Sequence, residues 1–179
     1  MNEKAKVLIL GLSFLTCLVL AYAENILFFQ SLGNIFANPW TAVLVVFSHN
    51  VLAVSLIIFG MTFYVRYVLT FLPKEKFGYI VLQHPRLFAF IFTVMILAIS
   101  ILRANTLLRI EFLVNTILVI LLLSIPQGVL EGYAIFLAIN KTLEKNMTKK
   151  NIVTIYSLFL LAAILEVSFI QILLATLAK

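Results

Sequence analysis

Long apolar runs separated by short polar segments are the feature that most restricts how this chain can fold. A run of about 20 apolar residues is long enough to cross the hydrocarbon core of a bilayer as a helix. Only a helix or a closed barrel satisfies all backbone polar groups there. The sequence therefore predicts an all-α integral membrane protein with about five transmembrane helices, near residues 6–23, 40–65, 87–102, 107–140 and 152–178.

Composition agrees with this class of protein, because 64% of the residues are hydrophobic and 11% are charged, against about 25% charged in soluble domains. Five spans with short connections use up all 179 residues, so we expect one membrane domain over residues 1–179. The net charge of +6 comes from Lys and Arg, which lie mostly between the apolar runs. Such residues anchor a chain to anionic lipid headgroups, so we expect membrane lipids as partners and no nucleic acid.

The N-terminal run allows two interpretations. Lys4 and Lys6 precede an apolar stretch that ends in Ala21-Tyr22-Ala23, which is similar to a secretory signal with a small-residue cleavage site. The apolar stretch is longer than usual for such a signal, and we expect it to remain as the first span. The single Cys17 rules out a disulfide framework within the chain.

Three short motifs predict where helices start and stop. Asn38-Pro39-Trp40 is typical of a helix start, with Asn as the cap and Pro at the first helical position. A tight turn is expected through Ala104-Asn105, between the third and fourth runs. Pro126-Gln127-Gly128 predicts that the fourth helix is broken, because Pro lacks a backbone donor and Gly loosens a helix. A half-length helix would then resume over residues 129–140.

The distribution of basic residues predicts the orientation, because cytoplasmic loops carry an excess of Lys and Arg. The connection at residues 24–38 has none, whereas residues 66–86 and 141–150 are both rich in them. This alternation fits a multi-pass protein of the cell membrane with a cytoplasmic N-terminus and an outside C-terminus. It requires that residues 107–140 cross the membrane once. The basic residues of the two rich segments are Arg66, Lys74, Lys76, Arg86, Lys141, Lys145, Lys149 and Lys150.

Polar residues inside three of the apolar runs are the candidate functional site. At a rise of about 1.5 Å per residue, they fall at middle depth in their spans. Ionisable groups at that depth usually face a partner, a cavity or a relay. One shared intramembrane cluster would satisfy them all, formed by His49, Asn50, Gln127, Glu131 and Glu166.

The residues alone leave the role of this cluster open. Glu131 and Glu166 are either paired structurally with His49, Asn50 or an arginine, or they form a proton or cation site. Gly128 and Gly132 lie on one helix face, and we expect them to serve close helix packing rather than ligand binding.

No sequence motif indicates catalysis. The chain has two histidines, His49 and His84, on different segments, whereas an intramembrane metalloprotease needs a His-Glu-x-x-His helix or an equivalent set. Neither a Gly-x-Ser-x-Gly motif nor a phosphate-binding loop occurs. We therefore expect no enzyme, no catalytic residue, no metal site and no cofactor.

Three segments in order carry a resemblance to a known family. They are Asn50 with the following VLAVSLIIFG, then Pro126-Gln127-Gly128 with Glu131 and Ala134, and finally Ala162-Ala163-Ile164-Leu165-Glu166. Together they resemble the stage II sporulation protein M family of small polytopic membrane proteins. The chain departs from the family's pattern at Gln127, where a histidine is usual, and at residues 74–78, where an Asn-Gly pair is expected.

The resemblance implies a membrane scaffold or assembly protein, as the namesake acts with the stage II sporulation proteins D and P. Its partners would be a second copy of the chain, as a homodimer, or other membrane proteins. The alternative is a transporter or permease subunit, in which the broken fourth helix and the two glutamates form a proton, ion or substrate site, as broken helices do in transporters.

Overall fold

The computed structural model describes residues 38–68, 83–108 and 114–177, together with Val81 and scattered residues between 12 and 36. Its long helices are α2 (Pro39–Phe63), α5 (Pro85–Leu108), α6 (Val114–Leu143) and α7 (Lys149–Leu177). A short π-helix, η1 (Tyr64–Val68), continues α2. The described residues form helices and no strand, which confirms the all-α prediction. Much of the predicted first span, Cys17 included, and residues 69–80 lie outside the described part.

The helix start predicted at Asn38-Pro39-Trp40 is confirmed. The Asn38 side-chain oxygen accepts hydrogen bonds from the backbone N–H of Trp40, at 3.1 Å, and of Thr41, at 3.4 Å. Pro39 takes the first helical position, where its missing N–H costs nothing because no helical acceptor is available. The sequence therefore fixes this end of α2 locally.

The turn predicted at Ala104-Asn105 is wrong, because α5 continues through it to Leu108. The segment Ile101 to Leu108 contains neither Gly nor Pro. Leu, Arg and Ala favour a helix, and one Asn disfavours it only slightly. The start of α6 is at Val114 rather than near residue 107, and residues 109–113 are outside the described part.

The break predicted in the fourth helix is also absent, because α6 is one helix from Val114 to Leu143 with Pro126 inside it. A proline removes one backbone hydrogen bond, whereas the bonds on both sides of it remain. The helix runs from Val114 to Ile125 before the proline and from Gln127 to Leu143 after it. These long flanking helical segments therefore outweigh one missing bond.

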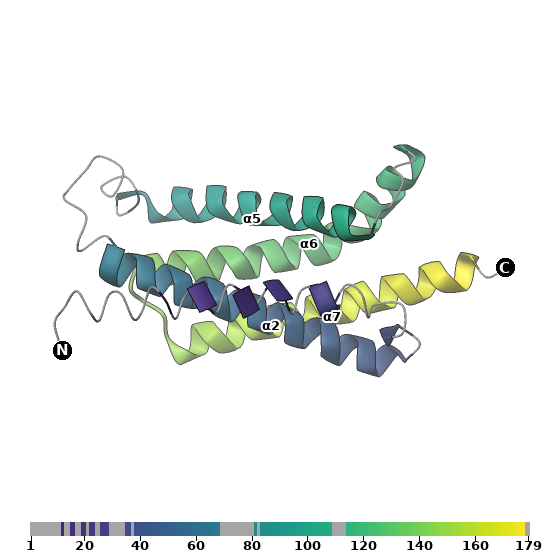
Figure 1. Ribbon diagram of the computed structural model, residues 1–179, viewed down its shortest axis with the longest axis horizontal. Helices are drawn as coiled ribbons and strands as arrows, with labels where there is room; N and C mark the ends of the chain where they lie inside the picture. Colours follow the sequence, from purple (N-terminus) through teal and green to yellow (C-terminus); the bar gives the residue numbers. More distant parts are fainter. Residues whose placement is uncertain are drawn as a thin grey trace.

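The four long helices run lengthwise beside one another, and successive helices point in opposite directions (Figure 1). Helix α6 packs against α2, α5 and α7, and α2 also packs against α7. The end of α2, the start of α5, the end of α6 and the start of α7 consequently lie at one end of the bundle. We call it the basic end, since Arg66, Arg86 and Lys145 belong to it.

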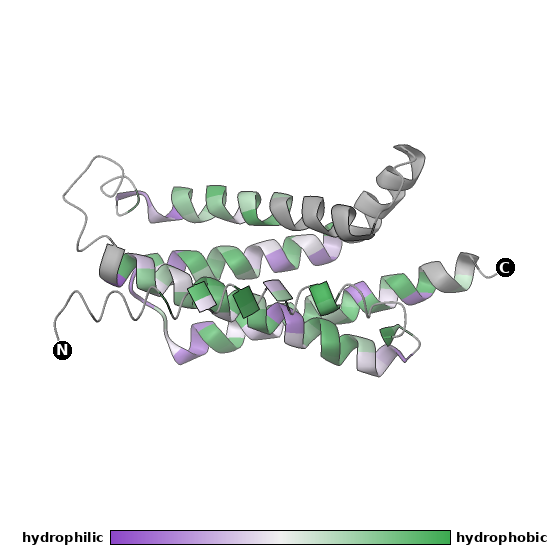
Figure 2. Ribbon diagram, viewed as in Figure 1, coloured by the Kyte–Doolittle hydropathy of each residue, from purple (hydrophilic) through white to green (hydrophobic). Residues whose placement is uncertain are grey.

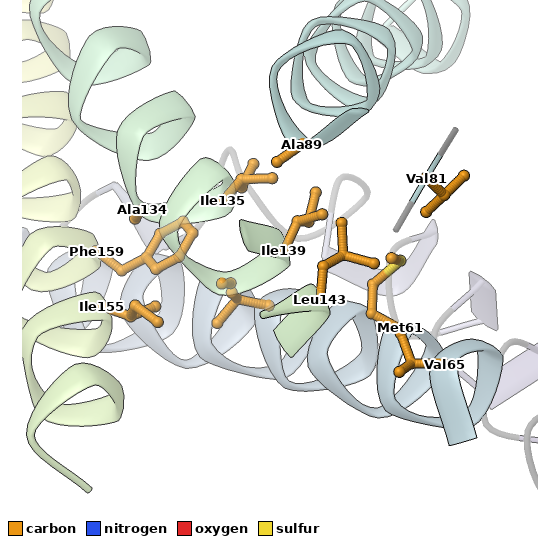
Figure 3. Packing of buried hydrophobic residues seen from close by; sticks show 12 residues of the cluster. Met61, Val65, Val81, Ala89, Ala134, Ile135, Ile139, Leu143, Ile155 and Phe159 are labelled. Atoms are coloured by element: carbon orange, nitrogen blue, oxygen red, sulfur yellow. The ribbon is translucent and has the colours of Figure 1, made fainter. Parts of the chain in front are cut away.

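The main core lies between α2, α5, α6 and α7, toward the basic end (Figure 3). Ile139 of α6 and Ile155 of α7 are fully buried, and Val54 of α2 packs in the same cluster. Ala134 and Ala138 are also fully buried. Such small side chains let helix backbones approach closely. A second cluster joins α2 and α7 farther from the basic end, formed by Ala42, Val46, Ala163 and Val167.

The outer faces of the bundle are apolar. Figure 2 shows that hydrophobic residues predominate along the described length of the helices, with hydrophilic ones where α5 and α7 begin and a few more toward the middle of the bundle. On α5 the exposed residues Leu87, Phe90, Ile91 and Val94 form such a face. Two helices are long and apolar enough to cross a membrane, over Pro39–Arg66 and Lys149–Ile172, and a shorter apolar helix covers Pro85–Ala98. That count refers to the described residues only.

Candidate functional site

A hydrogen bond between side chains 81 residues apart joins α2 to α6. The Asn50 Nδ2 donates to Glu131 Oε1 over 3.0 Å, and both side chains are partly buried. We call this contact the polar pair. The hydrogen bond forms only when this side of α2 faces this side of α6 at the same level, so it favours one rotation and one register of the two helices.

Glu166 lies on α7, near enough to Glu131 for the charges of the two carboxylates to interact. No hydrogen bond joins Glu166 to another residue in the part of the chain that the structure describes. Two half-buried carboxyl groups that face one bundle interior repel each other when both are ionised. One proton or one cation between them would remove that repulsion.

Gln127 lies on the same side of α6 as Glu131, four residues earlier, which is about one helical turn. Its Oε1 is buried and has no hydrogen-bond partner among the described residues. Ala134 of α6 and Phe159 of α7 pack in one cluster. Gln127 is seven residues before Ala134, and Glu166 is seven residues after Phe159. Because α6 and α7 are antiparallel, Gln127 and Glu166 lie at the same level. This level is about two helical turns from the contact of Ala134 with Phe159, on the side away from the basic end.

His49 has a different neighbour from Asn50. Its ring stacks on Phe28, with the centroids 4.1 Å apart and the planes at 8°. One step along a helix turns a side chain by about 100°, so His49 faces the N-terminal segment while Asn50 faces α6. Of the five residues predicted to cluster, the structure thus brings Asn50, Gln127, Glu131 and Glu166 to one region and directs His49 toward Phe28.

The two glycines predicted to share a packing face have different surroundings. A Cβ atom added at Gly132 would lie 3.1 Å from Leu97 Cδ1 of α5, whereas one added at Gly128 would have no described neighbour within 4 Å apart from its own helix. Pro126 is exposed. Gly132 therefore permits the close approach of α5 to α6, and the segment at Pro126 and Gly128 faces outward from the described bundle.

Sequence reasoning missed three further polar contacts. The Ser55 and Tyr156 hydroxyl oxygens lie 3.0 Å apart and link α2 to α7. Gln171 Nε2 donates to the Phe36 carbonyl oxygen over 2.7 Å. A polar network at the basic end centres on Glu144. The first two involve neutral polar residues within apolar runs, and an inventory that included Ser, Tyr and Gln beside the charged residues would have found them.

Glu144 accepts hydrogen bonds from Lys141 Nζ, at 2.9 Å, and from Asn140 Nδ2, at 3.0 Å, and Arg86 Nε lies 4.0 Å from its Oε1. The bond from Lys141 is the main reason that the pKa of this carboxyl is lowered from 4.5, and Asn140 and Arg86 act in the same direction. The network connects the end of α6 to the start of α5.

We expect this network to make the stability of the protein depend on acidic pH. Because the pKa of Glu144 is lower in the folded chain, its contribution is complete above about pH 4.5 and is lost as the pH falls through the folded-state pKa. Wild type should exceed Glu144→Gln by at most about 1 kcal/mol in free energy of unfolding at pH 7, and the difference should vanish in acid. Melting of both proteins from pH 7 to pH 3 measures this. A difference that stays constant over that range would contradict it, and Lys150→Gln is the charge-change control.

The cavities described for the bundle lie away from the polar pair. One is lined by Gln83 to Leu87 at the start of α5, and the other lies between α6 and α7 near Lys141. Among the described residues no group of three or more His, Cys, Asp or Glu side chains is arranged to hold a metal ion.

Comparison of the chain with protein families, with curated proteins and with solved structures found no match. The resemblance to the stage II sporulation protein M family therefore stays a prediction from the residues quoted above.

Proposed function

We propose that the chain is a multi-pass membrane scaffold, which holds partner membrane proteins or a second copy of itself through its apolar outer faces. The observation that carries this proposal is the polar pair, which closes α2 directly onto α6 through Asn50 and Glu131. A contact of this kind fixes the arrangement of helices, which is the property a scaffold needs.

The placement of basic residues supports a membrane location. Helix direction alternates along the chain, so the basic segments around Arg66, Arg86 and Lys145 come to one end of the bundle. Basic ends of membrane helices face the cytoplasm. With one span before α2, this arrangement gives five crossings, a cytoplasmic N-terminus and an outside C-terminus. The resemblance to the stage II sporulation protein M family supports the same function.

A transporter or permease subunit is the second candidate, and Gln127 and Glu166 are the observation that favours it. The Gln127 oxygen is buried without a donor, and Glu166, at the same level, has no hydrogen bond in the described part. A transported proton or cation bound there would satisfy both groups. Buried carboxylates of this kind carry protons in many pumps and transporters.

The two functions are separated by purification of tagged protein from its native membranes, together with a complementation assay in the deletion strain. If the chain is a scaffold, purification of wild type, Glu131→Gln and Glu166→Gln should each recover the same membrane partner in a fixed stoichiometry. All three proteins should also complement the deletion. Replacing Phe90 and Val94 of the exposed α5 face by Ala should reduce the partner's recovery. Gln variants that fold and keep their partner but fail to complement would contradict the scaffold and favour transport.

A further inference from the structure

A shallow groove of about 210 Å³ lies between α6 and α7 close to the basic end. Tyr133, Leu137 and Lys141 line it from α6, and Asn151 and Thr154 line it from α7. The residues from α6 are four apart, so they follow one another along a single helix face. The groove therefore runs lengthwise along the bundle, beginning at its charged end.

The side chains at the charged end of the groove carry N–H groups that are not used in hydrogen bonds among the described residues. Lys141 Nζ carries three N–H groups and gives one to Glu144 Oε2 over 2.9 Å. Asn151 Nδ2 carries two N–H groups and gives one to the Asn146 carbonyl oxygen over 2.9 Å. The Thr154 hydroxyl donates to the Lys150 carbonyl oxygen. Lys141 and Asn151 thus present free donors from two different helices at one point.

Basic residues outnumber acidic ones around this point. Lys145 is exposed in the connection between α6 and α7, Lys149 and Lys150 are exposed in the first turn of α7, and Glu144 is the one acidic residue between Lys141 and Asn151. The first turn of α7, which begins at Lys149, adds the positive end of its helix dipole. An anion is therefore favoured beside Lys141.

The other end of the groove is apolar. Tyr133 lies eight residues from Lys141, which is about 12 Å along the helix axis. Leu137 lies between them, and Tyr133 is 53% exposed. A ligand that fills the groove must carry a negative, hydrogen-bond-accepting group at one end and an apolar chain at the other. A phosphate ester attached to an acyl chain has this polarity and this length.

We propose that the groove binds an anionic phospholipid, with its phosphodiester at Lys141 and Asn151 and one acyl chain along Leu137 and Tyr133. The proposal rests on the membrane location given under the proposed function, and not on the scaffold role. The lipid would occupy the leaflet at the basic end and bind α6 to α7 at their shared connection.

The test is native mass spectrometry of the full chain, purified in detergent, delipidated, and titrated with phosphatidylglycerol or phosphatidylcholine. Wild type should bind phosphatidylglycerol in preference to phosphatidylcholine. Lys141→Gln should weaken phosphatidylglycerol binding about fivefold, the effect of one lysine close to an anionic headgroup. Lys145→Gln removes the same charge just beyond the end of α6 and outside the groove, and it should change the affinity less than about twofold, since charges in contact with solvent are screened.

Thr154→Phe is the second variant, because it fills the groove without altering any charge or the pair of Lys141 and Glu144. It should also weaken phosphatidylglycerol binding, while melting temperatures show that both variants are folded.

Equal losses in Lys141→Gln and Lys145→Gln would overturn the site in favour of general surface attraction. Displacement of the lipid by millimolar glycerol phosphate would overturn it in favour of a free phosphate ester. Protein that washes off native membranes at alkaline pH would defeat the membrane location itself, whereas failed partner recovery alone would leave the lipid site standing.

Discussion

Glu131→Ala should lower the free energy of unfolding by about 1–3 kcal/mol, the usual cost when a partly buried hydrogen-bonding group loses its partner. The group that is left without a partner is the Asn50 amide, which donates to Glu131 over 3.0 Å in the native bundle. Glu131→Gln should cost much less, because its amide oxygen can accept the same hydrogen bond. Thermal or denaturant unfolding in detergent of wild type and of both variants gives these values.

A double-mutant cycle isolates the pair from the rest of the cluster. Asn50→Ala and Glu131→Ala together should cost less than the sum of the single changes, since the interaction can be lost only once. Interhelical hydrogen bonds measured this way in membrane proteins average about 0.6 kcal/mol and reach about 1.7, and we expect the coupling of this pair to lie within that range. Ser168→Ala is the control, because the Ser168 hydroxyl is exposed and donates within α7. Additive single effects would show that Asn50 and Glu131 do not stabilise each other.

The fold was predictable where a local signal sets it. The cap at Asn38 and the apolar length of α2 and α7 are properties of short sequence segments. Prediction failed at Ala104-Asn105 and at Pro126, where α5 and α6 continue as helices. In both cases a local breaker, weak at Asn105 and strong at Pro126, competes with long helical runs on either side, and the backbone bonds of those runs decide the outcome.

The sequence predicts how deep the site residues lie along their helices, but it does not predict which way their side chains point. Counting residues from the helix starts places Asn50, Glu131 and Glu166 at similar levels, and the structure brings them near one another. The same count cannot separate His49 from Asn50, although one faces Phe28 and the other faces α6. Because α2 is apolar on all sides, its sequence has no polar face from which its rotation could be derived.

Gly132→Leu should lower the free energy of unfolding by about 1–3 kcal/mol, the usual cost of overpacking. A Cβ at this position already lies 3.1 Å from Leu97 Cδ1, so a larger side chain must push α5 away from α6. Gly128→Leu is its matched control, since it makes the same replacement one turn earlier on the same helix. Apart from its own helix, no described residue lies within 4 Å of a Cβ there, and replacing Gly by a good helix former favours a helix by up to about 1 kcal/mol.

Unfolding of both variants in detergent, at a concentration where the chain is monomeric, measures the difference between the two glycines. Gly132→Leu should melt below wild type, and Gly128→Leu should melt at or above it. Equal destabilisation by both changes would mean that the outer side of α6 at Gly128 is covered in the monomer, contrary to the open space beside it. If Gly128→Leu instead leaves the monomer intact but weakens recovery of the membrane partner, the open side of α6 is where that partner packs. This outcome follows from the proposed scaffold, because small residues admit close helix contacts in membranes.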